Sequence, residues 1–285
     1  MAIVLVFVVM AIVGPWLFPD PTAFVGVPHA SPSGDHVFGT TGQGQDVLAQ
    51  TIAGARTTLL VGLVVGLLSV AIGAFVGVAA GYFGGWVDDL VSLVINVFLV
   101  IPGLPLAIVL AAYLPSGPAT IAFVLVVTGW AWNARVVRSE ALTLRRKDFV
   151  AAAIVSGEGH LRIIASEMLP NLTSLLVSQL IGATTYAIGA QVGLEFLGLG
   201  DVSSVTWGTN LYWAANDAAL LTGSWWTFVP TGVCVALVGF GLTLVNFGID
   251  EVTHPRLGAE RHWRRALAGH VVGRLGPSTP VVRDG

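Results

Sequence analysis

Side chains with the chemistry for catalysis are few in this chain of 285 residues, and they form no familiar catalytic pattern. Neither H-E-x-x-H, which binds catalytic zinc, nor G-x-S-x-G, which presents a nucleophilic serine, occurs in the sequence. All six histidines lie outside the predicted membrane spans, so none can act beside a nucleophile or a metal at membrane depth. The sequence therefore predicts a protein that is not an enzyme, with no catalytic residue and no metal ligand.

A glycine-rich stretch at residues 39–44 (GTTGQG) is the part of the sequence nearest to a phosphate-binding loop. Such a loop needs Lys and then Ser or Thr after its last glycine, because the lysine and the backbone amides hold the phosphates. Gln45 and Asp46 stand at those positions. We expect no nucleotide or other cofactor in this chain, and any step driven by ATP must draw its energy from another chain.

The composition is that of an integral membrane protein, because 55% of the residues are hydrophobic and only 10% are charged. The mean hydropathy is +0.83, and soluble domains carry about 25% charged residues. Apolar runs of about 20 residues, enough to span the hydrocarbon as a helix, recur without strand-like alternation. We expect an all-α fold with six transmembrane helices, at about residues 2–18, 57–83, 90–113, 119–137, 172–194 and 225–249.

The basic residues predict the orientation of these spans. Six spans place the polar segment 138–171 and the C-terminal tail on the same side of the membrane, which collects 12 of the 13 Lys and Arg residues. Only Arg56 lies on the other side. Because basic loops stay in the cytoplasm, both ends of the chain are predicted to be cytoplasmic. Within the tail, residues 261–265 (RHWRR) indicate a contact with anionic membrane lipid.

Small residues in the second span predict where helices pack. Gly62, Gly66, Gly73, Gly77 and Gly81 fall on one helical face, which lets another helix approach closely.

Polar residues in the spans are few. Two prolines follow Asn96 in the third span and are expected to kink it beside a cavity. Apart from Glu195 at an outer boundary, the spans contain no Asp, Glu or His near the midplane, which disfavours a carrier coupled to protons or sodium. The amides of Asn96, Gln179 and Gln191 could line a polar path, although hydrogen bonding between helices would explain them equally well.

The segment 140–171 is the longest that a bilayer would exclude, since a charge at the bilayer centre costs about 2.5–3.5 kcal/mol. Residues 149–155 are apolar and rich in alanine, and glycines at 157 and 159 interrupt the chain after them. A helical pattern then resumes at 161–169 and ends before Pro170. We predict two short helices joined at a glycine turn, with an alanine face on which another protein docks.

The outer loop 195–224 is unusual because it opens with an apolar, glycine-rich stretch at 195–200 (EFLGLG). This stretch is too short to span the membrane, and Trp207 follows it. It predicts a short helix that dips into the outer leaflet or a surface for an extracellular partner. An ordinary interfacial helix anchored by tryptophan is the alternative.

Several of these segments together resemble one family. The segment 140–171 is similar to the EAA loop of bacterial ATP-binding-cassette (ABC) importer permeases, in the DppC/OppC branch for peptides and nickel. Five other segments resemble further signatures of that branch and occur in the same order. They are HVFGTTGQGQDVL (36–48), GARTTLLVG (54–62), AGYFGGWVDD (80–89), LEFLGLG (194–200) and TWG (206–208). The resemblance covers roughly residues 36–258.

The resemblance implies a type I ABC importer permease in the bacterial plasma (inner) membrane. Such a subunit pairs with a second, paralogous permease, and each forms half of the translocation pore. One or two ABC ATPases, which bind ATP and Mg, would dock beneath the pair, and an extracellular solute-binding protein would deliver the cargo; no nucleic acid is involved. The ATPase contacts would come from Phe149, Ala152, Ala153, Gly157, Arg162 and Pro170. The contacts with the binding protein would come from Glu195, Phe196, Gly198 and Trp207.

The chain departs from the family pattern at a few positions. Ala151 stands where a Glu usually precedes the paired alanines, and GEGH (157–160) replaces a common Gly-Ala-Ser. Oligopeptides are the first expectation for the cargo. Related permeases import oligosaccharides or nickel, which are the alternatives, and an ion-coupled carrier that acts alone is a third reading.

The expected organisation has four parts. They are a first transmembrane helix (1–19), an external loop (20–55), a permease core (56–258) and a cytoplasmic tail (259–285). Within the core, the cytoplasmic coupling loop is 138–171 and the outer loop is 195–224.

Overall fold

In the computed structural model of the chain, the described residues are 1–18 and 20–253. The chain divides into two units, Met1–Asn246 and Phe247–Gly285, and the packing described below is that of the first unit. The tail 259–285 and its predicted lipid contact at 261–265 lie outside the described residues.

The described residues form helices joined by loops that hold two isolated β-bridges, which confirms the predicted all-α class. The elements in chain order are α1 (Ala2–Leu17), α2 (Val47–Phe83), α3 (Gly85–Val100), α4 (Gly103–Tyr113), α5 (Pro118–Arg145), α6 (Asp148–Val155), α7 (His160–Ile163), a π-helical segment η1 (Ile164–Met168), α8 (Leu169–Phe196), α9 (Trp207–Asn216), α10 (Ala219–Thr222), a 3₁₀ turn η2 (Trp225–Thr227) and α11 (Val229–Thr253).

Four helical segments of the described chain are long and apolar enough to cross a bilayer: Val47–Phe83, Pro118–Arg145, His160–Phe196 and Trp225–Ile249. The pair α3 and α4 is a fifth candidate, bent by 81° at the break between the two helices. α1 has 16 residues, which give about 24 Å of helix against about 30 Å of hydrocarbon. The sixth span therefore stays a prediction that rests on α1.

α2 packs against α5 and α8 through its glycine face, as the spacing predicted. Gly73, Gly77 and Gly81 face α5, whereas Gly62 and Gly66 face α8. A Cβ atom built at Gly77 would lie 2.7 Å from a carbonyl oxygen of α5, and one built at Gly66 would lie 3.1 Å from a backbone nitrogen of α8. We call this contact the glycine seam. It brings the helix backbones closer than any larger side chain allows.

The predicted kink in the third span is a full break at Pro102. α3 ends at Val100, Ile101 is extended, and Pro102 is the N-cap of α4. The residue before a proline avoids the helical region, and the proline itself has no N–H to bond to the preceding turn. The chain therefore turns by 81° between α3 and α4.

Two helices extend beyond the spans predicted from hydrophobicity. α2 begins at Val47 instead of residue 57, because the Asp46 carboxylate caps it by accepting a hydrogen bond from the Ala49 amide at 3.0 Å. α5 continues to Arg145 instead of ending at residue 137. Hydrophobicity locates the part of a helix that lies in hydrocarbon, and a helix can continue into water on either side.

The prediction that Pro170 ends a short helix before the fifth span is wrong. α7, η1 and α8 form one helical run from His160 to Phe196. Pro170 occupies the first turn of α8, where a proline is tolerated, and the π-helical segment directly before it shifts the hydrogen-bond register. The segment after α6 is therefore mechanically continuous with a membrane-crossing helix.

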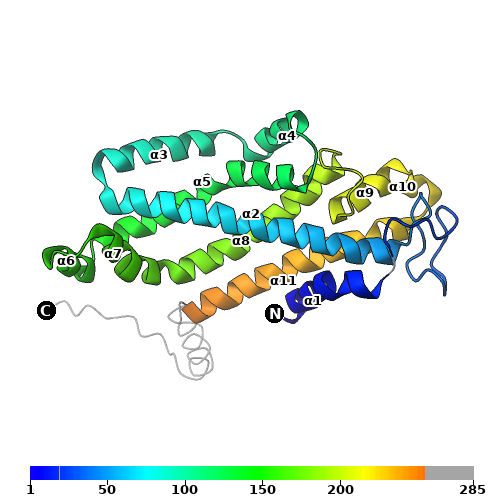
Figure 1. Cartoon of the computed structure of the whole chain (residues 1–285), viewed down its shortest axis with the longest axis horizontal. Coiled ribbons are helices and arrows are strands. Elements are labelled where there is room, and N and C mark those ends of the chain that lie inside the picture. The colour runs from blue at the N-terminus through cyan, green and yellow to red at the C-terminus, as the bar shows by residue number, and fades with distance from the viewer. Residues whose placement is uncertain (19, 254–285) are drawn as a thin grey trace, which may run out of the picture. The chain divides into compact units, whose positions relative to one another are not determined.

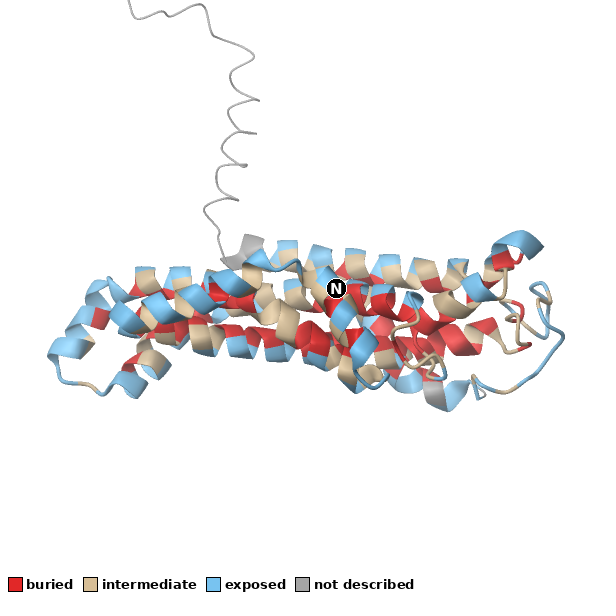
Figure 2. Cartoon of the chain, turned by 90° about the horizontal axis from the view of Figure 1, so that it is seen from above, coloured by how far each residue is buried: buried red, intermediate tan, exposed pale blue. Residues whose placement is uncertain are grey.

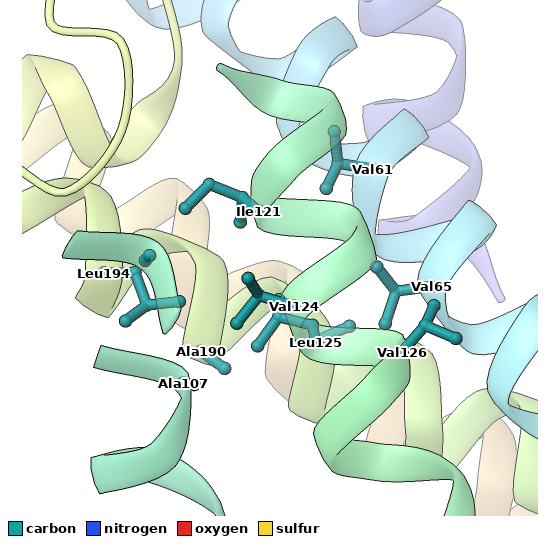
Figure 3. Close-up of a cluster of buried hydrophobic side chains, with 11 residues drawn as sticks. Val61, Val65, Ala107, Ile121, Val124, Leu125, Val126, Ala190 and Leu194 are labelled. Atoms are coloured by element: carbon teal, nitrogen blue, oxygen red, sulfur yellow. The ribbon is translucent and has the colours of Figure 1, made fainter. Parts of the chain in front are cut away.

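Three clusters of buried apolar side chains hold the bundle together. One joins α2, α4, α5 and α8 and includes Val65, Leu125 and Leu194 (Figure 3). A second joins α2, α5, α6, α7 and α8 around Val150, and a third joins α1, α2, α8, α9 and α11 around Trp207. α6 and α7 lie at one end of the bundle, the α6 end, and α9 and α10 lie at the other, the α9 end (Figure 1). Buried residues follow the bundle, whereas exposed residues dominate the α6 end (Figure 2).

Substitution of Gly77 by Val is expected to destabilise the bundle. The new side chain would meet backbone and side-chain atoms of α5 closer than 3 Å, and overpacking of this kind costs about 1–3 kcal/mol. Thermal unfolding of the purified protein in detergent measures the effect. The control is Gly239→Val in α11, because no atom lies within 4 Å of a Cβ built there. Equal midpoints for the two variants would contradict a tight glycine seam.

Candidate functional site

The predicted docking segment contains α6, a helix with one fully buried side chain and otherwise largely exposed faces. Val150 of α6 is fully buried in the cluster that joins α6 to α2, α5, α7 and α8. Phe149 is 39% and Val155 is 88% exposed. Ala152 is exposed and Ala153 is half-buried. α6 thus presents an apolar surface with small side chains at the end of the bundle, a feature that marks contact sites for other proteins.

Gly157 makes the turn after α6, as predicted. Its φ is +78°, in the left-handed region that favours glycine. The Gly157 amide donates to the Ile154 carbonyl at 3.0 Å, and the Glu158 amide donates to the Ala153 carbonyl at 3.1 Å. This pair of bonds is the Schellman motif, which closes a helix C-terminus. No atom lies within 4 Å of a Cβ built at Gly157, so the turn faces open space.

Arg162 and Pro170 complete the set of residues predicted for coupling. The Arg162 side chain is 73% exposed, and its Nε lies 3.5 Å from the Glu158 carboxylate. Pro170 is exposed in the first turn of α8. All six predicted coupling residues therefore lie at the α6 end.

An aromatic cluster ties the docking segment to the end of α2. The Tyr82 hydroxyl lies 2.8 Å from His160 Nδ1 at the start of α7. The rings of Tyr82 and Phe83 pack edge-on against the His160 ring, at centroid distances of 5.6 and 5.8 Å. Sequence reasoning missed this contact because it joins residues 78 positions apart, and no local pattern marks it.

An ion pair ties α3 to α5 near the same end. Arg138 Nη2 donates to Asp88 Oδ2 at 2.8 Å, and both side chains are partly buried. The sequence contains Asp88 and Asp89, but no local pattern indicates that Arg138, 50 positions later, is a partner. The ion pair thus joins α3 to α5, and the Tyr82 contact joins α7 to α2.

A cavity of about 550 Å³ opens between α2, α5 and α8, beside the end of α3. Its lining includes Ser69 on α2, Trp132 and Asn133 on α5, and Gln179 and Tyr186 on α8. Both amide atoms of Gln179 and the Ser69 hydroxyl are buried without a hydrogen-bond partner in the described chain. Gln179, predicted to line a polar path, therefore lies on a cavity. Ser69 could have been found from the sequence, since it lies on the glycine face between Gly66 and Gly73.

The structure does not bring the other two candidate path residues to this cavity. Asn96 is exposed on α3, and its Oδ1 lies 3.5 Å from Arg135 Nη2. Gln191 is fully buried, and its Nε2 donates to Glu195 Oε1 one turn further along α8 at 2.9 Å. This bond lies within one helix, so it is neither a path contact nor a link between helices.

Glu195 and Trp207 lie in the interior of the α9 end, where the sequence predicted a surface. Glu195 is 2% exposed, and its Oε2 accepts a hydrogen bond from the Thr206 hydroxyl at 2.6 Å. Trp207 is fully buried, and its indole N–H donates to the Thr51 carbonyl at 2.9 Å. These contacts fasten α9 to α8 and α2, so neither side chain is free to contact another protein in this structure.

Phe196 and Gly198 lie nearer to the surface of the same end. Phe196 is 47% exposed. Gly198 has a φ of +77° and ends α8, where the Leu199 amide donates to the Leu194 carbonyl at 3.1 Å. The stretch 195–200 therefore forms the end of α8 and the turn after it, and a short helix, α9, follows in the same loop.

Comparison with known proteins identifies the family. Residues 69–257, more than half of the chain, match the family model of the binding-protein-dependent transport system inner membrane component. The chain belongs to this family. The permease is 34% identical over 260 residues to the dipeptide transport system permease protein DppC of Bacillus subtilis, covering 90% of this chain and 80% of that protein.

Two further relatives agree with this assignment. The permease is 32% identical over 239 residues to the oligopeptide transport system permease protein OppC of Mycobacterium bovis, with coverage of 83% and 80%. It is 31% identical over 264 residues to a putative peptide transport system permease protein of Brucella suis, with coverage of 91% and 88%. Family and apolar helices together make the permease a multi-pass membrane subunit, in a family of transport components rather than catalytic subunits.

Replacement of Tyr82 by Phe is expected to loosen the docking segment while the bundle stays folded. The change removes only the hydroxyl that bonds His160, and one such bond contributes about 0.5–1.5 kcal/mol. Amide hydrogen exchange in residues 148–163 should therefore become faster. The matched control is Tyr113→Phe, because Tyr113 is 87% exposed at the end of α4. Unchanged exchange in the Tyr82 variant would show that the hydroxyl does not hold α7.

Replacement of Glu195 by Ala is expected to destabilise the α9 end. It would leave the buried Gln191 amide and Thr206 hydroxyl without their carboxylate partner, at a cost of about 1–3 kcal/mol for each unpaired group. The thermal midpoint should fall, whereas Phe196→Ala at the exposed neighbouring position should change it less. A Glu195 variant as stable as the unmodified protein would rule out a fastening role for the carboxylate.

Proposed function

We propose that this permease forms half of a heterodimeric translocation pore in an ATP-dependent importer of oligopeptides. A second, paralogous permease subunit supplies the other half. One or two ABC ATPases bind ATP and Mg and dock on the permeases, and an extracellular solute-binding protein delivers the peptide. The printed names of the relatives, dipeptide and oligopeptide transport permeases, support the choice of cargo.

The observation that carries the proposal is the exposed, alanine-rich α6 held to the bundle by Val150. A surface helix that buries a single large side chain gains little from its own chain, and its exposed apolar residues favour burial against a partner. Ala152 and the open turn at Gly157 allow a partner's backbone to approach closely. An ATPase cleft that encloses α6 would cover Phe149 and Val155.

Movement of a docked ATPase would reach the membrane helices through contacts already described. The bond between Tyr82 and His160 joins α7 to α2, and the run from His160 to Phe196 joins α7 directly to α8. ATP-driven closure of the ATPases would displace α6 and α7 and convert the pore from inward-facing to outward-facing. Arg162 and Pro170 lie where they would follow this displacement.

The distribution of basic residues supports an orientation with the α6 end in the cytoplasm. Arg145, Arg146 and Lys147 lie directly before α6, and Arg162 lies in α7. The importer would then occupy the bacterial plasma membrane with both ends of the permease cytoplasmic and with α1 as a sixth span. The division into a first span (1–19), an external loop, a core and a cytoplasmic tail follows from this topology.

The same orientation indicates which residues would line the translocation path and which would contact the binding protein. Gln179 lines the cavity between α2, α5 and α8 and is our candidate for the translocation path, while the exposed Asn96 could face the second permease. The exposed Phe196 and the turn at Gly198 would contact the binding protein. Glu195 and Trp207 would support this surface from inside.

Substitution of Gly157 by Glu tests the docking proposal. The side chain adds bulk and charge at the turn, so ATPases should no longer co-purify and uptake should fall about tenfold or more, equivalent to about 1.4 kcal/mol of docking free energy. The permease itself should still insert. The proteins that co-purify in mild detergent and peptide uptake by reconstituted vesicles are the two measurements.

A matched control separates docking from backbone strain. Gly223 at the α9 end has a φ of +73°, is exposed, and has no atom within 4 Å of a built Cβ, as is the case for Gly157. Gly223→Glu carries the same strain and charge and should retain both ATPases and uptake. Normal ATPase recovery and uptake in the Gly157 variant would refute the docking role, and peptide uptake without any ATPase chain would refute the importer as proposed.

A further inference from the structure

The cavity between α2, α5 and α8 contains polar atoms that the described chain leaves unpaired. Gln179 Nε2, Gln179 Oε1 and Ser69 Oγ are buried without a hydrogen-bond partner, and Ser69 is 2% exposed. Buried polar groups in proteins are nearly always hydrogen-bonded, because a missing partner costs free energy. A water or a ligand in the cavity would supply the partners that these three atoms lack within the described chain.

The size and walls of the cavity fit a small organic ligand. Its volume of about 550 Å³ lies within the range of about 300–1,000 Å³ that is usual for ligand pockets. Leu99 and Leu125 give apolar lining, and the rings of Trp132 and Tyr186, 62% and 49% exposed, also line it. A few polar atoms among apolar walls are the usual composition of a site that fixes the orientation of its ligand.

The type of polar group indicates what is bound. None of the lining residues, all within the described part of the chain, is charged, so the site offers no counter-ion for a charged terminus or side chain. A glutamine side chain presents one carbonyl and one N–H₂ group side by side. A peptide unit presents the complementary N–H and C=O groups, and it does so whatever its side chains are.

We infer that this cavity binds the main chain of a peptide in transit. Gln179 Nε2 donates to a peptide carbonyl, Gln179 Oε1 accepts from a peptide N–H, and Ser69 Oγ offers a further polar contact from α2. Trp132 and Tyr186 contact apolar side chains of the cargo. The inference rests on the proposed function, since it needs a peptide to pass this face of the permease.

The lining offers an internal contrast to Gln179. Thr128 also faces the cavity, but its hydroxyl already donates to the Val124 carbonyl of its own helix at 3.0 Å. A ligand gains less from a hydroxyl that is already paired. Thr128→Val is therefore a matched control, because it removes a polar group from the same cavity without removing an unpaired one.

The test uses the complete importer, with its binding protein, reconstituted in liposomes. Uptake of trialanine and of trialanine N-methylated at both of its peptide bonds is measured for the unmodified permease, Gln179→Leu and Thr128→Val. Gln179→Leu removes both proposed hydrogen bonds, and because the loss of even one predicts a two- to tenfold effect, trialanine uptake should fall about two- to tenfold or more. The same variant should lower uptake of the methylated peptide clearly less than uptake of trialanine, because the methylated peptide has no peptide N–H that could donate to Gln179 Oε1.

The comparison of four uptake rates isolates the permease from its binding protein. Any preference of the binding protein for one peptide applies equally to both permeases, so it cancels in the double ratio. A double ratio above about two supports the site. A ratio of one, or an equal loss in Thr128→Val, overturns it.

A stability measurement excludes a purely structural role for Gln179. Replacing an unpaired buried amide by leucine should leave the thermal midpoint unchanged or raise it. A lowered midpoint would show that the amide already has a partner within the protein and would overturn the inference. If the unmodified importer takes up oligosaccharides and no trialanine, the proposed function fails as well, whereas trialanine uptake that is insensitive to Gln179 overturns the cavity site alone.

Discussion

At five positions on α2 only a hydrogen atom fits between that helix and its neighbours, and the bundle depends on this contact. Apolar helices in a membrane gain little from leaving lipid, so their association relies on close van der Waals contact. Gly73, Gly77 and Gly81 provide that contact with α5, and Gly62 and Gly66 provide it with α8. α2 is thereby the common partner of the two other helices that line the cavity. Without the seam, neither the cavity nor the aromatic contact at Tyr82 would have a fixed geometry.

The length of α2 lets one helix serve both ends of the bundle. Its 37 residues give about 56 Å of helix, nearly twice the thickness of the hydrocarbon. One end carries the Thr51 carbonyl that accepts from the Trp207 indole, and the other carries Tyr82, which bonds His160. The α9 end is therefore fastened by buried hydrogen bonds, whereas the α6 end is exposed and joined through a few contacts. Such asymmetry suits a bundle that receives a displacement at one end only.

The sequence predicted those features of the fold whose physical cause lies in the local residues, and it missed features that depend on other parts of the chain. The glycine seam, the break at Pro102 and the turn at Gly157 depend on backbone and packing properties of single residue types, and all three were predictable. The start of α2 after Asp46 was missed, because a capping residue, and not hydrophobicity, decides where this helix begins. Pro170 was misjudged because the π-helical segment before it lets the helical run continue.

At the candidate sites, too, the sequence could not reveal contacts with residues from other parts of the chain. Glu195 and Trp207 were expected at a surface, because the family resemblance implied a contact with the binding protein there. Their partners Thr206 and Thr51 come from distant parts of the chain or from across a loop, and no local pattern announces them. Gln179 was chosen for its polarity within an apolar span, and Gln191 was chosen for the same reason. Only the packing separates Gln191, whose Nε2 donates to Glu195, from Gln179, whose two amide atoms both lack a partner in the described chain.

The position of Gln179 along α8 connects the cavity to the docking segment. α8 meets the glycine seam at Thr184 and Ile188, and Gln179 lies between these residues and the start of the helix. The helical run from His160 has no break before Gln179 within the described chain, so in the proposed importer a displacement of α7 would travel along it. It would reach Gln179 before it reaches the seam. Ser69 belongs to the wall on α2, and its Oγ lies 3.6 Å from a Cβ built at Gly129 of α5. In the importer proposed above, the polar wall on α8 is therefore the part of the cavity that a docked ATPase would move, and the wall on α2 is the part that would stay.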